Sequence, residues 1–431
     1  MSHAAAHPGD HAHPSHAAGG GGHHHGPDVK KLLAHDNVHA PGFKSGLSIG
    51  LMVLGFVGIA AALVAYFTGD EAVRSAALFS YHAGAIIALG LCLGPLGVVL
   101  MFHLVDSGWS VTLRRQFENA ATLIWAPMIL LIPTVIVGGS NLFHWMHPGG
   151  DPVIAAKSTY LNPVFFYIRF AVYFAIWGYL AFRMFSLSRL QDQTGDKWLS
   201  NKAKFTSAWG MLAFALSVAF AGFDLIKSLD PHWFSTMFGV YFFAGNMIAG
   251  LSLMTVLIYL IRSTGKLEGL VTAEHSHDMG KLMLGFTIFW AYIGFSQYFL
   301  IWYANIPEET AYMTVRSQGG WETLGKLMMF GHFLGPFIVM LFRDVKRSWL
   351  LAVVGVWMIA MHCVDIFWLV RPIPFVNDPA DKMHLGLVDL AGVVGPVLLL
   401  VGLLLWRVGA SPLIPLQDPR LGEAMEHKNY V

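Results

Sequence analysis

Ionisable side chains interrupt several long apolar runs of this sequence. The candidates are His82, Arg169, Asp224, Lys227, His332, His362, Asp365 and Asp389. A charged group in hydrocarbon is costly unless it is paired or hydrated, so such residues mark candidate proton or ligand pathways. Most of them fall in the half of the membrane that we assign below to the outer side. We therefore predict a proton pathway that opens toward that side.

Two pairs of these residues have helical spacing. His362 and Asp365 are three residues apart, as are Asp224 and Lys227, which brings side chains together on one helix surface. A carboxylate beside an imidazole holds its tautomer and favours proton acceptance from a hydroxyl such as that of a quinol. Each pair can also be a buried ion pair that fixes helix packing. The deeper position of His362 and Asp365 favours the functional interpretation for that pair.

A quinone site also needs aromatic walls and a few polar anchors. Gln297 is a candidate anchor, and Tyr298 and Trp302 follow it on the same apolar run. Aromatic residues in membrane helices also serve in packing and in the interfacial belt. Both interpretations stay open for these three residues.

The elements that position these residues are long apolar segments. The chain has 431 residues, of which 55% are hydrophobic and 12% are charged, and its mean hydropathy is +0.56. A membrane-spanning helix needs about 20 apolar residues. Ten runs qualify, so we predict an all-α integral membrane protein. They lie near residues 45–67, 77–105, 117–137, 163–187, 203–225, 235–262, 282–303, 322–342, 348–370 and 385–406.

The distribution of cations gives the orientation. Ten spans place both termini on one side, and nineteen of the 27 Lys and Arg residues group with the termini. The positive-inside rule then predicts cytoplasmic termini in a bacterial inner membrane. Three regions follow: a disordered, His- and Gly-rich tail over residues 1–44, a membrane domain over residues 45–408, and a cytoplasmic C-terminal tail over residues 409–431.

The cysteine and charge content limits cofactors and partners. Cys92 and Cys363 are the only cysteines and no CxxCH occurs, so the chain offers no iron-sulfur cluster, thiolate zinc site or covalent haem of its own. We expect no metal site. A single haem between His82 and His362 stays open. The net charge of +1 gives no reason to expect nucleic acid.

Three segments carry a family resemblance. They are residues 295–310 (FSQYFLIWYANIPEET), residues 103–115 (HLVDSGWSVTLRR) and residues 142–148 (LFHWMHP). They resemble the F subunit of bacterial alternative complex III, a membrane subunit of the NrfD and polysulfide-reductase type. The resemblance runs over residues 46–406 and leaves out the His-rich tail.

The resemblance implies a subunit of a quinol:electron-acceptor oxidoreductase, with no activity in isolation. Iron-sulfur and multihaem cytochrome c subunits would lie on the periplasmic side, above this chain and a related NrfD-like membrane subunit. Quinol or menaquinol would be the substrate of the complex, and the F subunit would serve proton translocation, assembly or support of the quinol site. It also implies two four-helix bundles, from spans two to five and six to nine, with spans one and ten flanking them.

A function without redox partners is the alternative. Two apolar runs contain the same Leu-Gly-Pro sequence, at residues 93–95 and 334–336. Such Gly-Pro pairs are typical of repeated, interrupted helices, as in a secondary transporter or proton channel. A stand-alone cytochrome b is a third hypothesis.

Overall fold

In the part of the chain that the computed structural model describes, ten helical segments are long and apolar enough to cross a membrane. The structure describes residues 29–147, 149–375 and 383–429. The ten segments are α3 (Ser45–Thr68), α4 (Glu71–Leu104), α5 to η2 (Val111–Val137), α9 (Pro163–Thr194), α10 with η4 (Trp198–Leu229), α11 (Phe238–Arg262), α12 (Ala273–Ala304), α14 to α15 (Trp321–Leu341), α17 (Leu350–Val370) and α18 (Leu387–Val408). The predicted all-α membrane fold is confirmed, and the chain is a multi-pass membrane protein.

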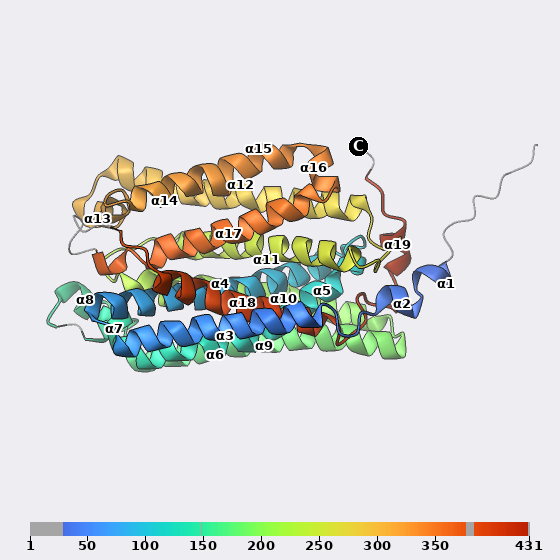
Figure 1. Cartoon of the computed structure of the whole chain (residues 1–431), viewed down its shortest axis with the longest axis horizontal. Coiled ribbons are helices and arrows are strands. Elements are labelled where there is room, and N and C mark those ends of the chain that lie inside the picture. The colour runs from blue at the N-terminus through green and yellow to red at the C-terminus, as the bar shows by residue number, and fades with distance from the viewer. Residues whose placement is uncertain (1–28, 148, 376–382, 430–431) are drawn as a thin grey trace, which may run out of the picture.

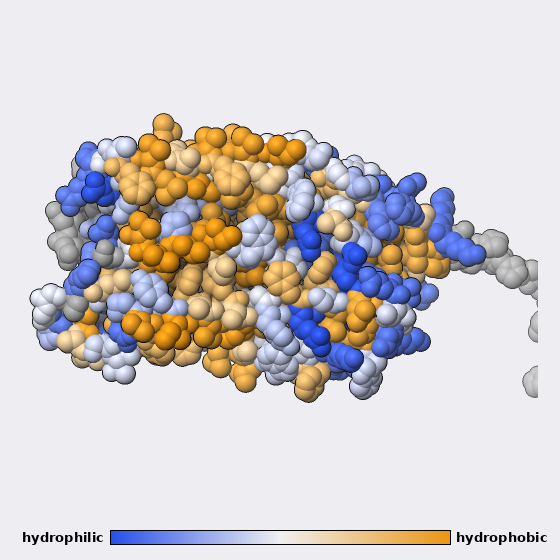
Figure 2. All heavy atoms as spheres, turned by 90° about the horizontal axis from the view of Figure 1, so that it is seen from below, coloured by the Kyte–Doolittle hydropathy of each residue, from blue (hydrophilic) through white to orange (hydrophobic). Residues whose placement is uncertain are grey.

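Short elements close the two ends of the bundle (Figure 1). We call the end that carries α1, α2, α16 and α19 the termini end, and the end that carries α7, α8 and α13 the far end. Their bounds are α1 (Val29–Leu32), α2 (His35–Val38), α7 (Gly139–Leu142), α8 (Pro152–Ala156), α13 (Pro307–Arg316), α16 (Arg343–Arg347) and α19 (Leu421–Met425). Figure 2 shows a broad apolar band between two hydrophilic ends, as a membrane protein requires.

Polar caps set the ends of the spans. The Asp70 carboxylate accepts a hydrogen bond from the backbone N–H of Val73 at 2.9 Å, which starts α4 six residues before the apolar run begins. Asn162 caps α9 in the same way through the N–H of Phe165. α12 ends at Ala304 and is followed by Asn305, whose φ of 49° is left-handed. The helices are therefore longer than their apolar cores, because the caps lie in the polar loops.

The central helix of the molecule is α4, and most of its residues are buried. It packs against α5, α10, α11 and α17. One group of packed spans is α4, α5 to η2, α9 and α10; the other is α11, α12, α14 to α15 and α17. The flanking helices α3 and α18 pack on each other and on α4. This is the arrangement of two bundles and two flanking helices that we expected.

Glycine allows α3, α4 and α18 to approach closely. A Cβ atom at Gly84 of α4 would lie 2.3 Å from the carbonyl oxygen of Gly392, and one at Gly55 of α3 would lie 2.5 Å from the backbone nitrogen of Leu399. Small residues at such crossings let membrane helices pack backbone to backbone. The α3, α4 and α18 contact therefore depends on these glycines.

We expect Gly84→Ala to lower the free energy of unfolding by about 1–3 kcal/mol, because the methyl group meets backbone that cannot rotate away. Chemical denaturation in mixed micelles measures the effect. Gly50→Ala on α3 is the control, since a Cβ there meets no atom within 4 Å. Equal stability of the two variants would contradict the assignment of a tight contact.

The N-terminal tail is ordered further than we expected. Residues 29–44 form α1 and α2, and Val38 is 1% exposed. The Asn37 side chain donates to the carbonyl of Glu268 at 3.0 Å, and the Leu413 N–H donates to the carbonyl of Val38 at 2.8 Å. The prediction of a disordered segment up to residue 44 is thus wrong for its last part, because these residues bind both the loop after α11 and the C-terminal tail. Residues 1–28 lie outside the described residues.

Candidate functional site

Six polar residues from α11, α12, η5 (Met328–Leu334) and α17 form one buried group. This group, which we call the central cluster, consists of Tyr241, Asn246, Trp290, His332, His362 and Asp365. Each of the six side chains is at least nine-tenths buried. The cluster includes three of the predicted pathway residues.

Among the described residues, the hydrogen-bond partners of the Asp365 carboxyl are all neutral. The Tyr241 hydroxyl donates to Oδ1 at 2.5 Å, and the Trp290 indole N–H donates to Oδ2 at 3.2 Å. By contrast, the buried carboxyls of Asp224 and Asp389 each face an arginine. Asp365 can therefore take up or release a proton without breaking an ion pair, as a relay group must.

His362 lies between Asp365 and Asn246. A Cβ atom at Gly245 would be 3.5 Å from His362 Nδ1 and 3.7 Å from Asp365 Oδ2. A Cβ atom at Gly90 would be 3.1 Å from His362 Nε2 and 2.4 Å from Asn246 Oδ1. Glycine at these two positions leaves room for the polar side chains to lie next to each other. The order along the cluster is Asp365, His362, Asn246.

His332 reaches the cluster from an irregular helix. Its ring centroid is 4.2 Å from that of Trp290, and its segment η5 is a π-helix. Pro336 lies four residues later and has no N–H to donate to the carbonyl of His332, which breaks the regular hydrogen-bond pattern. Such π-segments are frequent at functional sites.

Both nitrogens of His332, both nitrogens of His362 and both polar atoms of the Asn246 amide have no hydrogen-bond partner among the described residues. Leaving one buried polar group unsatisfied costs about 1–3 kcal/mol, and native proteins satisfy such groups with ordered water. We therefore expect water molecules between these side chains. A neutral imidazole both donates and accepts, so the two histidines and the water can pass protons along the cluster.

Arg169 and Asp224 form a separate ion pair between α9 and α10. Arg169 donates from Nε and Nη2 to the two carboxylate oxygens at 2.7 and 2.9 Å, and the Tyr173 hydroxyl donates to Oδ2 at 2.7 Å. The structure does not bring Asp224 to Lys227, because α10 ends at Leu225 and the chain continues in the short helix η4 (Lys227–Leu229). The expected Asp224–Lys227 pair is wrong.

Tyr173→Phe removes one hydrogen bond to the Asp224 carboxylate. We expect it to lower the free energy of unfolding by about 1.5–3 kcal/mol, the range for hydrogen bonds to charged groups. Thermal unfolding in detergent measures the change. Tyr179→Phe on the same helix is the control, since that side chain is 55% exposed. A Tyr173→Phe protein as stable as its control would contradict this.

Two further predicted residues are satisfied locally. His82 contacts the Thr134 hydroxyl through Nδ1 at 3.0 Å and the carbonyl of Leu225 through Nε2 at 2.8 Å, so neither ring nitrogen is free for a haem iron. Asp389 accepts hydrogen bonds from Arg371 and from Ser80. Seven of the eight predicted residues, all except Lys227, thus lie in several small networks and not in one continuous group.

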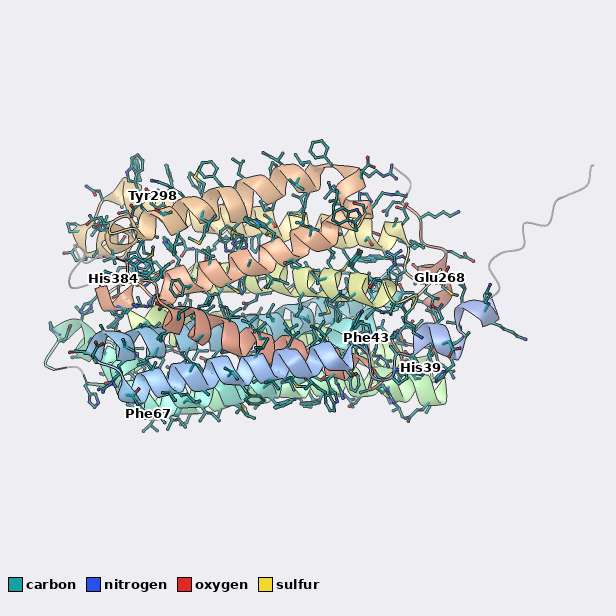
Figure 3. All side chains as sticks on the ribbon, viewed as in Figure 1. His39, Phe43, Phe67, Glu268, Tyr298 and His384 are labelled. Atoms are coloured by element: carbon teal, nitrogen blue, oxygen red, sulfur yellow. The ribbon has the colours of Figure 1, made fainter. Side chains whose placement is uncertain are left out.

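The predicted quinone residues lie away from the central cluster. Gln297 Oε1 accepts a hydrogen bond from the Ser235 hydroxyl at 2.6 Å. Tyr298 and Trp302 are 52% and 63% exposed, and Figure 3 places Tyr298 at the rim of the far end. These positions match an interfacial aromatic belt, while a quinone approaching from the lipid remains a prediction for them.

Neither a protein-family model nor a curated protein matches this chain. The functional argument therefore depends on the geometry described above and on the three sequence segments.

A second buried polar group lies at the termini end, on α5 (Val111–Ala121). Glu118 accepts hydrogen bonds from Arg114 and Arg115, both at 3.1 Å. Arg114 also pairs with Asp418 of the C-terminal tail, and Arg115 with Asp192 of α9, both at 2.7 Å. Burial alone would raise the pKa of Asp418, but the Arg114 guanidinium holds it below its usual value. This network fastens the tail to the bundle.

Sequence reasoning missed Tyr241, Asn246 and Trp290. None of them carries a charge, and Tyr and Trp are common in apolar spans for packing alone. Asn246 offered a signal, because an amide inside the apolar run at residues 235–262 is costly unless it is hydrogen-bonded. The proximity of Asn246 and His362 could not be seen in the sequence, because the two residues lie far apart along the chain.

Proposed function

We propose that this chain is a proton-conducting membrane subunit of a quinol-oxidising complex of the alternative complex III type. The observation that supports the proposal is the central cluster. Within the part of the chain that the structure describes, Asp365 has no charged partner there, and His362, His332 and Asn246 have unpaired polar atoms. Membership of a redox complex is supported by the resemblance of residues 295–310, 103–115 and 142–148.

The depth of the cluster fits a path from the far end into the bundle. Asp365 lies five residues from the far end of α17 and His332 eleven residues from the start of α14, which correspond to about 7 Å and 16 Å along the helix axes. Protons would move between these depths through His362 and ordered water, and Asn246 would hold that water by hydrogen bonds. The direction of net movement would follow from the side on which quinol is oxidised.

Electrons would leave through partner subunits. Quinol oxidation yields protons and electrons together, and the two cysteines of this chain, both free, cannot hold an iron-sulfur cluster. Periplasmic iron-sulfur and multihaem cytochrome c subunits, beside a related NrfD-like subunit, would accept the electrons. The membrane would be the bacterial inner membrane, with both termini in the cytoplasm.

Purification of the native assembly tests the partnership. We expect the tagged chain to co-migrate with haem c and iron-sulfur subunits and to show quinol-dependent reduction of the haem. A native assembly without these subunits would remove the redox complex from the proposal.

A transporter or proton channel is the second candidate function. The π-helical break at η5, beside unpaired histidine nitrogens, is the observation that favours it, because interrupted helices line transport sites. Liposomes that contain this chain alone distinguish the two functions. Solute or proton flux across these liposomes would favour the transporter or channel. Liposomes that show no such flux would favour the subunit.

A further inference from the structure

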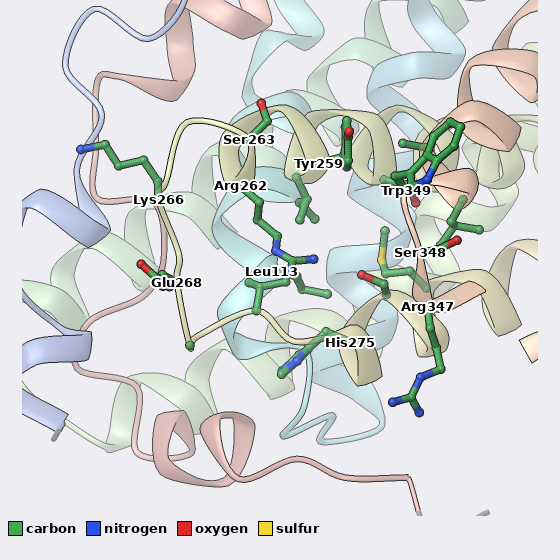
Figure 4. A pocket seen from close by; sticks show the side chains of 18 of the residues that line it. Leu113, Tyr259, Arg262, Ser263, Lys266, Glu268, His275, Arg347, Ser348 and Trp349 are labelled. Carbon is green, nitrogen blue, oxygen red and sulfur yellow. The ribbon is translucent and has the colours of Figure 1, made fainter. Parts of the chain in front are cut away.

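A cavity of about 600 Å³ opens at the termini end, far from the central cluster. It lies between the last turn of α11 and the first turns of α12 and α17 (Figure 4). Its polar lining includes Tyr259, Arg262, Ser263, Ser276, Ser348 and Trp349. The cavity is therefore at the depth where a span meets the lipid headgroups.

Arg262 is one of three cations in this lining, and of the other two Lys266 donates a hydrogen bond to the carbonyl of Asp36. Figure 4 shows its side chain reaching from α11 toward Leu113, across the space that the lining residues enclose. No ion pair or hydrogen bond of its guanidinium occurs within the described part of the chain, whereas Arg347 pairs with Glu274 at 2.5 Å. Glu268, the only carboxylate in the lining, points away from Arg262. An anion in the cavity would meet one free guanidinium.

The backbone N–H groups that line the cavity already have partners. At the start of α17, Leu351 and Ala352 donate to the carbonyls of Ser348 and Trp349, and at the start of α12 Ser276 donates to the carbonyl of Thr272. The positive potential of the cavity therefore comes from its side-chain cations.

The mouth of the cavity continues into the lipid-facing surface. Tyr259 and Trp349 at its edge are 43% and 59% exposed, and Val353 and Val356 follow on the same side of α17 at 51% and 57%. Tyrosine and tryptophan are typical of the membrane interface, and exposed valine is typical of the hydrocarbon region. A bound molecule would thus have a polar group in the cavity and an apolar part along α17.

We infer that this cavity binds the phosphate group of an anionic phospholipid, with Arg262 as the main contact and the acyl chains along Val353 and Val356. Basic pockets between helices at the cytoplasmic side of membrane proteins are suited to such headgroups. The lipid would stabilise the junction of α11, α12 and α17.

Native mass spectrometry of the full chain tests this inference. Phosphatidylglycerol and phosphatidylcholine are added separately to delipidated protein in detergent, and the dissociation constant of the first bound lipid is measured. We expect phosphatidylglycerol to bind more tightly, and Arg262→Gln to weaken its binding about fivefold while leaving phosphatidylcholine unchanged. Lys202→Gln, an exposed cation at the same end, is the control and should bind as the wild type does.

Three results would overturn the inference. Both lipids carry a phosphate group, but only phosphatidylglycerol has a net negative charge, so equal affinity would exclude a site for an anionic headgroup. Unchanged phosphatidylglycerol binding by Arg262→Gln would exclude this cavity. Inorganic phosphate that raises the melting temperature of the protein in phosphatidylcholine nanodiscs as much as phosphatidylglycerol does would show a site for free phosphate instead. Because Arg262 is exposed, its variant should fold, which the melting temperature checks.

Discussion

Asp365→Asn is expected to lower proton release by the intact complex about a hundredfold or more, the range for loss of a proton-transfer group. The amide has nearly the shape of the carboxyl and can still hydrogen-bond to Tyr241 and Trp290, so the packing should persist. It cannot exchange a proton at neutral pH. The measurement is proton release during quinol oxidation in proteoliposomes that contain the native assembly.

Two further variants sharpen this test. Asp365→Glu restores an exchangeable proton and should recover part of the rate, while His362→Ala should lower it as Asp365→Asn does. Haem content and melting temperature show whether each assembly is intact. If Asp365→Asn and His362→Ala both leave quinol oxidation and proton release at wild-type levels, the relay assignment is wrong.

Glu118→Ala is expected to lower the free energy of unfolding by about 3–5 kcal/mol. The substitution removes a carboxylate that two buried guanidinium groups share, so part of their positive charge is left uncompensated. Arg114 and Arg115 each keep one carboxylate, from Asp418 and Asp192. The side chains of Glu118 and both arginines are almost wholly buried. Water therefore cannot replace the lost carboxylate.

Denaturation in mixed micelles measures the loss. Lys204→Ala is the matched control at the same end, because Lys204 pairs with Asp106 on the exposed surface, where an ion pair contributes about 0–1 kcal/mol. Similar stability losses for the two variants would show that the α5 network is not the stabilising element that its burial suggests.

The spans were predictable from the sequence because hydrocarbon thickness fixes the length of an apolar helix. The side-chain pairs between different helices could not be predicted in this way. Spacing in the sequence describes one helix surface, so it could not indicate that Asp224 faces Arg169. The predicted Asp224–Lys227 pair also required α10 to continue through Lys227. The chain instead turns at Ile226.

The two Gly-Pro pairs had different structural outcomes that no local pattern distinguishes. α4 continues without a break through Pro95, and a Cβ atom at Gly94 would lie 2.1 Å from the carbonyl oxygen of Asn246, so this glycine serves a close approach to α11. Pro336 instead follows the π-segment that carries His332. The surrounding helices decide which outcome occurs, and they are known only from the fold.

Infrared difference spectroscopy of the intact complex during quinol oxidation tests the role of the central cluster most directly. We expect a carboxylic-acid C=O band that changes on turnover, shifts in heavy water and disappears in Asp365→Asn. A turnover spectrum with the same carboxyl bands in the wild type and in Asp365→Asn would contradict proton transfer through this cluster.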